Sequence, residues 1–314
     1  MTAHLNGDRK AAKRAALRQL PTERREAVAG ILFVLPDALG LLVFIGLPML
    51  LAIGLSAFEV DGFGGFRFVG LGNYARMVAD PLFWSALRVT LTFALMAVPL
   101  LYVIGLMLAL LVQKTSRFNT AMRFLFFAPQ VVSLVVVALV WQLMSVEKIG
   151  VLPRLIAGLG FGSVSFLGNP HVALFTVVLA FVWFLMGFYM LIFIGGLQDI
   201  PKEYYEAARI DGANRAQSFW HITLPLLRPT SFFVLVVSSV AAVSGQQAFD
   251  LVYVMTRGGP ANATLLLITY IYQQAFQYGA FGYASAMATL LVLMLMAITF
   301  AFFWATRGGR FQYD

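Results

Sequence analysis

The sequence predicts an all-α integral membrane protein that crosses the bilayer as six transmembrane helices. Of its 314 residues, 61% are hydrophobic and 11% are charged, and the mean hydropathy is +0.84. In an ordinary soluble domain, about a quarter of the residues are charged. Because lipid offers no hydrogen-bond partner to backbone groups, a spanning chain must be helical or a closed barrel. The apolar runs of this chain do not alternate with polar residues as barrel strands do, so helices are predicted.

Six apolar runs are long enough to cross about 30 Å of hydrocarbon at about 1.5 Å per residue. They lie at residues 28–57, 89–113, 122–145, 172–197, 229–249 and 283–306. The fifth run is the most polar, because it contains several serines and two glutamines. We therefore expect one membrane domain over residues 28–306, a basic tail at 1–27 and a short tail at 307–314.

The distribution of Lys and Arg predicts the orientation. Sixteen of these residues lie in the two tails and in the second and fourth connections, against six in the remaining connections. The side richer in Lys and Arg is normally cytoplasmic. We therefore place both termini in the cytoplasm. The tail at 1–27 is either a surface helix attracted to anionic lipid or a solvated segment, and both interpretations remain open.

Several classes of protein are disfavoured by what the sequence lacks. The chain has no cysteine, which excludes disulfides and thiolate metal sites. No G-x-x-x-x-G-K-[ST] phosphate-binding loop is present. The three histidines lie in tails or connections, which argues against haem ligation inside the membrane. We predict no catalytic residue and no metal site, and no nucleic-acid partner because the basic residues lie between apolar runs.

Asp37 is the one charged residue well inside an apolar run. It follows Pro36, so it could pair with a partner subunit or cap a helix that restarts after the proline. A self-contained ion-coupled carrier predicts several midplane charges and broken helices. A membrane enzyme predicts a catalytic cluster, and a scaffold subunit is a further alternative. None of these alternatives explains the fourth connection.

The fourth connection, at about 198–228, is cytoplasmic in this topology and predicts a helix-turn-helix elbow. Asp199 is placed to cap a helix entered through Pro201, and Glu203 adds negative charge at the positive end of the helix dipole. Gly212 is expected to end this helix in the left-handed conformation. A second short helix is expected from about Asn214 to Ile222. Small alanines on the first helix leave room for another protein surface.

The spacing in this connection resembles a known motif. Glu206-Ala207-Ala208, Gly212, Ile222 and Leu224-Pro225 match the EAA loop of binding-protein-dependent import permeases at every position. Three further segments resemble the carbohydrate-uptake branch, the permeases similar to those for maltose, lactose and glycerol-3-phosphate. These segments are Phe68-Val69-Gly70-Leu71 with Asn73-Tyr74, the run from Arg123 to Pro129, and Thr256-Arg257-Gly258-Gly259-Pro260.

This resemblance implies the transmembrane domain of a type I ATP-binding-cassette (ABC) importer in the bacterial cytoplasmic membrane. Its expected partners are a second permease subunit, an ABC ATPase dimer, an extracytoplasmic sugar-binding protein and the lipid bilayer. ATP and Mg would be bound by the ATPase, and no cofactor by this chain. The residues expected to couple to the ATPase are Tyr204, Tyr205, Glu206, Ala207, Ala208, Asp211, Gly212, Ile222, Leu224 and Pro225. The two tyrosines could instead lie at the membrane surface.

A sugar path needs amide and hydroxyl groups beside aromatic rings, because a sugar carries many hydroxyls and has apolar ring faces. We expect Ser244, Gln246 and Gln247 to lie on this path. Weaker candidates are Trp141, Gln142, Trp183, Phe188 and Tyr189. The polar residues could equally join helices by hydrogen bonds, and the aromatics could serve packing. Disaccharides, other oligosaccharides, amino sugars and glycerol-phosphates all remain open as substrates.

Overall fold

The computed structural model describes residues 22–60, 65–160 and 164–305. These form two compact units, one ending at Leu55 and one beginning at Ser56. The predicted tail at 307–314 lies outside the described residues, as does the tail at 1–27 except for its last six residues. Those residues are already helical, so the first helix begins before the predicted residue 28.

The first unit is an apolar helical segment. It consists of helix α2 (Thr22–Leu41), the π-turn η1 (Leu42–Gly46) and helix α3 (Leu47–Leu55). Pro36 lies inside α2 without interrupting it. The idea that Asp37 caps a restarted helix is therefore wrong, because no helix restarts there.

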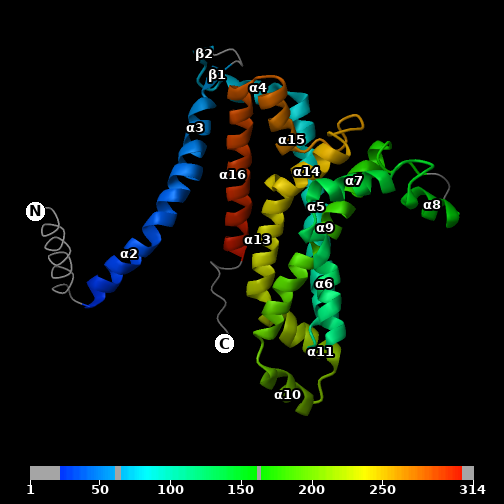
Figure 1. Cartoon of the computed structure of the whole chain (residues 1–314). Helices are drawn as coiled ribbons and strands as arrows, with labels where there is room; N and C mark the ends of the chain where they lie inside the picture. Colours follow the sequence, from blue (N-terminus) through cyan, green and yellow to red (C-terminus); the bar gives the residue numbers. More distant parts are fainter. Residues whose placement is uncertain (1–21, 61–64, 161–163, 306–314) are drawn as a thin grey trace, which may run out of the picture. The chain divides into compact units, whose positions relative to one another are not determined.

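The second unit contains the remaining elements (Figure 1). In chain order they are β1 (Phe58–Val60), β2 (Phe66–Phe68), α4 (Gly72–Ala79), α5 (Pro81–Val112), α6 (Arg117–Val131), α7 (Leu134–Met144), α8 (Val151–Gly158), α9 (Pro170–Gln198), α10 (Lys202–Ile210), α11 (Arg215–Ser218), η2 (Phe219–Thr223), α12 (Leu224–Leu226), α13 (Arg228–Ser244), α14 (Gln246–Met255), α15 (Leu267–Tyr272), η3 (Gln273–Gln277) and α16 (Phe281–Ala305).

Five helical segments in the described residues are long and apolar enough to span a membrane. They are Glu26–Leu55, Pro81–Val112, Pro170–Gln198, Arg228–Met255 and Phe281–Trp304. The remaining predicted span, at residues 122–145, corresponds to the pair α6 and α7. These two helices are bent by 95° at their junction, so the described residues contain six spans only if this bent pair is counted as one span. The predicted all-helical membrane fold is confirmed.

The span predicted over 122–145 is not one continuous helix. The chain leaves the helical conformation at Val132, whose backbone is extended (ψ 147°), and restarts after Ser133. Val131 and Val132 are β-branched and favour helices weakly. Hydropathy cannot reveal this break, since valine is as apolar in an extended segment as in a helix.

The fifth predicted run, 229–249, is also interrupted. Gly245 has an extended backbone (φ −66°, ψ 143°) and separates α13 from α14, which continues to Met255. A Cβ at residue 245 would lie 2.3 Å from the carbonyl oxygen of Ala241. Only glycine therefore fits this junction without a shift of the backbone.

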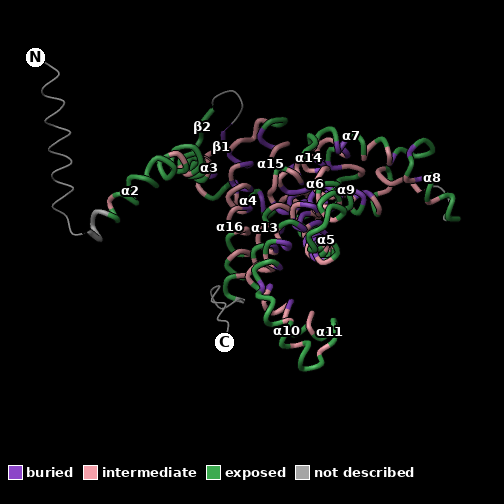
Figure 2. Tube along the Cα trace, turned by 60° about the horizontal axis from the view of Figure 1, so that its bottom comes forward, coloured by how far each residue is buried: buried purple, intermediate pink, exposed green. Residues whose placement is uncertain are grey.

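Helix α9 lies at the centre of the second unit, between α5, α6 and α13. Figure 2 shows buried positions along α5 and α9 and none on α10 or α11. The crossings are close because small residues lie at them. A Cβ on Gly187 would lie 2.2 Å from the carbonyl oxygen of Phe126 in α6, and one on Gly196 would lie 2.2 Å from the side chain of Thr230. Small residues that admit a neighbouring backbone are typical of membrane helix packing.

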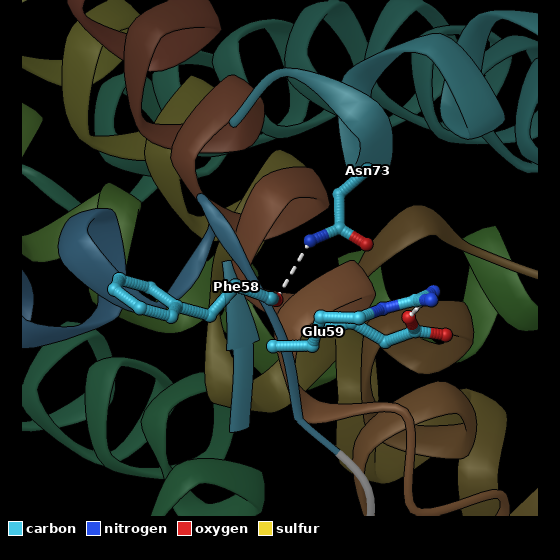
Figure 3. Close-up of polar contacts among 4 residues, drawn as sticks. Phe58, Glu59 and Asn73 are labelled. Carbon is cyan, nitrogen blue, oxygen red and sulfur yellow. Dashed lines mark hydrogen bonds and ion pairs between the residues drawn. The ribbon is translucent and has the colours of Figure 1, made fainter. Parts of the chain in front are cut away.

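The first segment that resembles the carbohydrate branch, from Phe68 to Tyr74, holds a small β-hairpin against α4. Strands β1 and β2 pair antiparallel, with Phe58 opposite Phe68. The Asn73 amide donates to the carbonyl oxygens of Ser56 and Phe58, at 2.8 Å each, and the Asn73–Phe58 bond is visible in Figure 3. The Tyr74 hydroxyl shares a hydrogen bond of 2.8 Å with Ser56 Oγ. The Asn-Tyr pair of the motif is thus a structural anchor.

The other two motifs also make structural hydrogen bonds, one at the end of a helix and one within a loop. Arg123 Nε and Nη2 donate to the carbonyl oxygen of Val112 at 3.0 and 2.7 Å, which satisfies the last turn of α5. In the glycine-rich loop, the Thr256 and Thr264 hydroxyls lie 2.7 Å apart, and Thr264 donates to the carbonyl of Gly259. These contacts give physical reasons for residues that the resemblance singled out.

Candidate functional site

The helix α10 of the elbow ends as predicted. Gly212 has a φ of +80°, and the N–H groups of Gly212 and Ala213 donate to the carbonyls of Arg209 and Ala208 at 3.2 and 2.8 Å. This pattern is a Schellman motif, which satisfies the carbonyls left unpaired at a helix end. The turn after α10 is therefore fixed by backbone hydrogen bonds.

The predicted start of α10 is only partly right. Glu203 lies in the first turn, as expected. The Asp199 cap is wrong, because Asp199 still has a helical backbone at the end of α9 and the residue before α10 is Pro201, which makes no side-chain cap. Residues 199–201 thus form a short connection.

The second part of the elbow begins with a capping box. The Asn214 side chain accepts from the Gln217 N–H at 2.9 Å, and the Gln217 side chain accepts from the Asn214 N–H at 2.8 Å. The single helix expected over 214–222 is instead the short helix α11 followed by the π-turn η2. Such π-turns often occur at functional sites.

The exposed side of the elbow is formed by α10. Glu206 and Ala207 are exposed, Ala208 is half-buried, and Ile210 is 87% exposed. Ile210 was missed by the sequence analysis, although an apolar residue at the end of a polar helix, two positions before Gly212, was a usable signal. Two acidic and two basic residues of α10 are exposed, so this surface presents charges of both signs beside a methyl group and an aliphatic side chain.

The two tyrosines differ in their surroundings. Tyr204 is 49% exposed. Tyr205 is half-buried, packs against the main core cluster and shares a hydrogen bond of 3.0 Å with Thr223 Oγ1 in η2. The remaining elbow residues expected to couple divide similarly. Asp211 and Gly212 are exposed, whereas Ile222, Leu224 and Pro225 are half-buried.

Two of the expected path residues line one pocket. Ser244 and Gln246 flank the Gly245 break and face a cavity of about 350 Å³. The other lining residues are Phe249, Ile268, Ile271, Tyr272 and Phe276. Gln247 is not among them. The sequence analysis missed the three aromatics, although pairs of aromatics four residues apart, Phe249 with Tyr253 and Tyr272 with Phe276, were visible.

The weaker path candidates lie elsewhere. Gln142 donates to the carbonyl of Met255 at 3.4 Å and so joins α7 to α14. Trp141 and Trp183 meet edge to face, with centroids 6.1 Å apart. Phe188 packs in the same manner on Tyr189, which is 1% exposed. None of these side chains lines the pocket beside Ser244, and their place on a path stays a prediction.

A second and larger pocket lies at the end of the bundle opposite the elbow. Its volume is about 550 Å³. It is lined by Glu59, Val60, Asn73, Arg76, Ala275, Phe276, Gln277, Tyr278, Gly279, Ala280, Phe281 and Tyr283. Phe276 belongs to the walls of both pockets. The guanidinium of Arg76 lies 4.2 Å from the ring centre of Tyr283.

A carboxylate holds this end of the bundle together. Asp80 Oδ2 accepts hydrogen bonds from the hydroxyls of Tyr270 at 2.6 Å and Tyr283 at 2.7 Å, and Oδ1 accepts from the N–H of Leu82 at 2.9 Å. Burial alone would raise the pKa of Asp80, but the hydrogen bonds from the two tyrosines and from backbone N–H groups outweigh it and lower the pKa. Burial, followed by the hydrogen bond to Asp80, raises the pKa of the Tyr270 hydroxyl.

These features define a multi-pass α-helical membrane subunit with a folded, exposed elbow at one end and two adjoining pockets toward the other. Residues 90–307 match the family described as "Binding-protein-dependent transport system inner membrane component". The chain belongs to this family.

Three relatives show how far the likeness extends. The chain is 36% identical over 293 residues to the probable ABC transporter permease protein YesP of Bacillus subtilis, covering 92% of this chain and 93% of that protein. It is 35% identical to the trehalose/maltose transport system permease protein MalF of Thermococcus litoralis (92% and 96% covered). It is 33% identical to the lactose transport system permease protein LacF of Rhizobium radiobacter (90% and 95% covered).

Solved structures share the fold. A chain in the crystal structure of a bacterial alginate ABC transporter, in complex with an alginate pentasaccharide-bound periplasmic protein, superposes with a TM-score of 0.77 at 21% identity. The match covers 91% of this chain and 95% of that one. The arrangement of helices is therefore that of an ABC importer transmembrane subunit.

Proposed function

We propose that this chain is a permease subunit of an ABC sugar importer, forming half of the translocation pathway and taking its energy from a separate ATPase. The observation that carries the proposal is the elbow. The first helix of the elbow, α10, has an exposed face, and a Schellman motif fixes the C-terminal end of this helix. A helix held in this way can transmit a push or pull from a docked protein to α13, through the α11, η2 and α12 segments that join the two helices.

The relatives support the substrate class. Their names include permeases for trehalose and maltose, for arabinooligosaccharides and for lactose. The pairing of Ser244 and Gln246 with aromatic residues on one pocket suits a carbohydrate. The family is described as binding-protein-dependent, and one relative and the solved structure are named as ABC transporters, which favours this role over a self-contained ion-coupled carrier.

The proposal includes the assembly and the orientation. The partners are a second permease subunit, an ABC ATPase dimer that binds ATP and Mg, and an extracytoplasmic sugar-binding protein. The chain itself binds no nucleotide and catalyses no reaction. Both termini and the elbow lie in the cytoplasm, as the Lys and Arg distribution indicates, and the pocket beside Glu59 then lies on the outer side of a bacterial inner membrane.

The test is assembly with the ABC ATPase that the proposal requires. We expect Glu206→Lys and Gly212→Pro to lose co-purification of the ATPase, because the first reverses a charge on the exposed face and the second forbids a φ of +80°. The controls are Glu147→Lys, an exposed charge far from the elbow, and Gly160→Pro, another glycine with positive φ in open space. Normal assembly and ATP hydrolysis in both elbow variants would contradict the docking role.

A further inference from the structure

The two pockets adjoin each other at a single aromatic side chain. Phe276 lies in the π-turn η3, is 70% exposed and belongs to both walls. Its ring is 5.1 Å from that of Tyr272 and 6.2 Å from that of Phe281. Phe276 is therefore held by neighbouring rings while much of its own surface remains open.

The larger pocket, which we name the outer chamber, presents groups that hydrogen-bond hydroxyls. Among its lining residues are Glu59, Arg76, Gln277 and Tyr278, which together offer a carboxylate, a guanidinium, an amide and a phenol. These groups both donate and accept hydrogen bonds. The outer chamber is thus suited to a ligand rich in hydroxyls.

The smaller pocket, which we name the inner chamber, is lined by three aromatic and two aliphatic side chains besides Ser244 and Gln246. Phe249 and Tyr272 lie 5.1 Å apart, and Tyr253 supports both rings at 5.4 and 5.3 Å. Its polar groups are Ser244 and Gln246, at the break of the fifth span. Aromatic faces suit the apolar faces of a sugar ring, and two polar groups fix orientation without holding the ligand tightly. A transport path needs such moderate binding, because the ligand must also leave.

The segment that carries these rings is anchored to the rest of the bundle. The N–H of Leu267 donates to Thr90 Oγ1 at 2.7 Å, and Tyr270 donates to Asp80. Leu265, Leu266 and Leu267 are at most 1% exposed. This connection therefore returns into the helical bundle beside α5, which brings Tyr272 and Phe276 next to the fifth span.

We propose that the two chambers are successive parts of one carbohydrate route, that Phe276 divides them, and that Tyr272 and Phe276 contact the apolar faces of the sugar as it passes to Ser244. This proposal rests on the sugar-import function above. It assigns substrate contact to aromatics in the last long connection, whereas the sequence analysis placed the path on the third, fourth and fifth spans.

This chain has no cysteine, so a direct test is practical: labelling is measured on this chain alone, where a thiol reagent reacts only at an introduced cysteine. The Ser244→Cys variant is prepared in the complete complex, purified through a tag on this chain and placed in lipid nanodiscs. Two uncharged methanethiosulfonates of similar size are compared, one bearing glucose and one bearing a hydroxyl-free ring. Reaction rates are measured without nucleotide and with ATP and vanadate, and the more reactive state is used.

We expect the glucose-bearing reagent to react with the thiol of the Ser244→Cys variant roughly threefold faster or more, the factor that one well-placed ring contact supplies. Adding Tyr272→Leu should remove this preference, and Tyr272→Phe should keep it. Phe276→Ala should raise the reaction rates of both reagents, because the side chain between the two chambers is removed. Phe276→Trp should lower both rates. The control Phe233→Cys, at a position 52% exposed on α13, should show neither preference nor any response to Tyr272→Leu.

Two results would overturn the route. Equal rates for the two reagents would mean that the inner chamber does not favour a sugar. An unreactive thiol in the Ser244→Cys variant in both nucleotide states would mean that another subunit or lipid fills the chamber. Co-purification of the ATPase is measured on the same samples. A sample with bound ATPase and no sugar preference refutes the route alone, whereas a preference without any bound ATPase refutes the subunit assignment alone.

Discussion

The close crossing of α6 and α9 gives a sharp prediction about stability. A Cβ added at Gly187 would lie 2.2 Å from the carbonyl oxygen of Phe126, 2.6 Å from its carbonyl carbon and 2.7 Å from Phe127 Cα. All three are backbone atoms, so no side-chain rotation relieves the overlap. Reaching an ordinary contact of 3.4 Å requires α9 and α6 to separate by about 1 Å, and overpacking of this kind costs about 1–3 kcal/mol.

The matched control lies on the same helix. Gly195 has nothing within 4 Å of its added Cβ. Gly195→Ala should therefore be neutral or slightly stabilising, since alanine favours a helix over glycine by about 1 kcal/mol in water. The two variants differ only in what the same methyl group meets.

The assay is thermal unfolding of the detergent-purified protein at one fixed heating rate, followed by the fraction that remains monodisperse. At about 2–4 °C per kcal/mol for a chain of this order of size, Gly187→Ala should lower the midpoint by several degrees and Gly195→Ala should not. A Gly187→Ala midpoint equal to that of Gly195→Ala would refute the close crossing of α6 and α9.

Three further changes probe the hydrogen bonds that hold the connections. The folded-state pKa of Asp80 is depressed, so its contribution to stability is present above the ordinary pKa of about 3.9 and is lost as pH falls through the lower folded value. Asp80→Asn should therefore weaken the dependence of the unfolding midpoint on pH in this acidic window. An unchanged dependence on pH would contradict the role assigned to Asp80. Asn73→Ala leaves two carbonyls without their donor, so the midpoint should fall by the equivalent of about 1–3 kcal/mol, and no fall would show that the hairpin does not depend on this amide. Tyr205→Phe and Thr223→Val remove the same hydrogen bond, and Thr223→Val also removes a longer one to the Ser218 carbonyl. In a double-mutant cycle the double variant should therefore be no worse than Thr223→Val alone, whereas additive losses would mean that the two hydroxyls act independently.

The turn chemistry of the elbow could be predicted from the sequence because local residues decide it. Gly212 ends α10 through backbone bonds within six residues, and Asn214 with Gln217 forms a capping box within four. The start of α10 was less predictable. Asp199 has the right side chain for a cap, but α9 continues through it, and where a long helix ends depends on tertiary packing.

The pocket residues divide in a similar way. Ser244 and Gln246 were recognisable because polar side chains are unusual in an apolar run. Tyr272 and Phe276 gave no such contrast, since aromatic residues are common near both faces of a membrane. Their position beside the fifth span depends on a connection that returns into the bundle, and the bond from Leu267 to Thr90 that fixes it joins residues 177 positions apart. A sequence read locally cannot predict such a contact.

The break at Gly245 shows how an interrupted helix can be tolerated in a membrane. The Gly245 N–H still donates to the carbonyl of Ala241 at 3.2 Å, and its own carbonyl accepts from the N–H of Phe249 at 3.3 Å. Both backbone groups of Gly245 itself therefore remain paired, which lipid favours for a residue inside a spanning segment. The change of backbone direction at Gly245 places Ser244 and Gln246 on the wall of one pocket. An unbroken helix would set these two residues about 200° apart around its axis, on opposite faces, so the glycine is what allows both polar groups to serve one cavity.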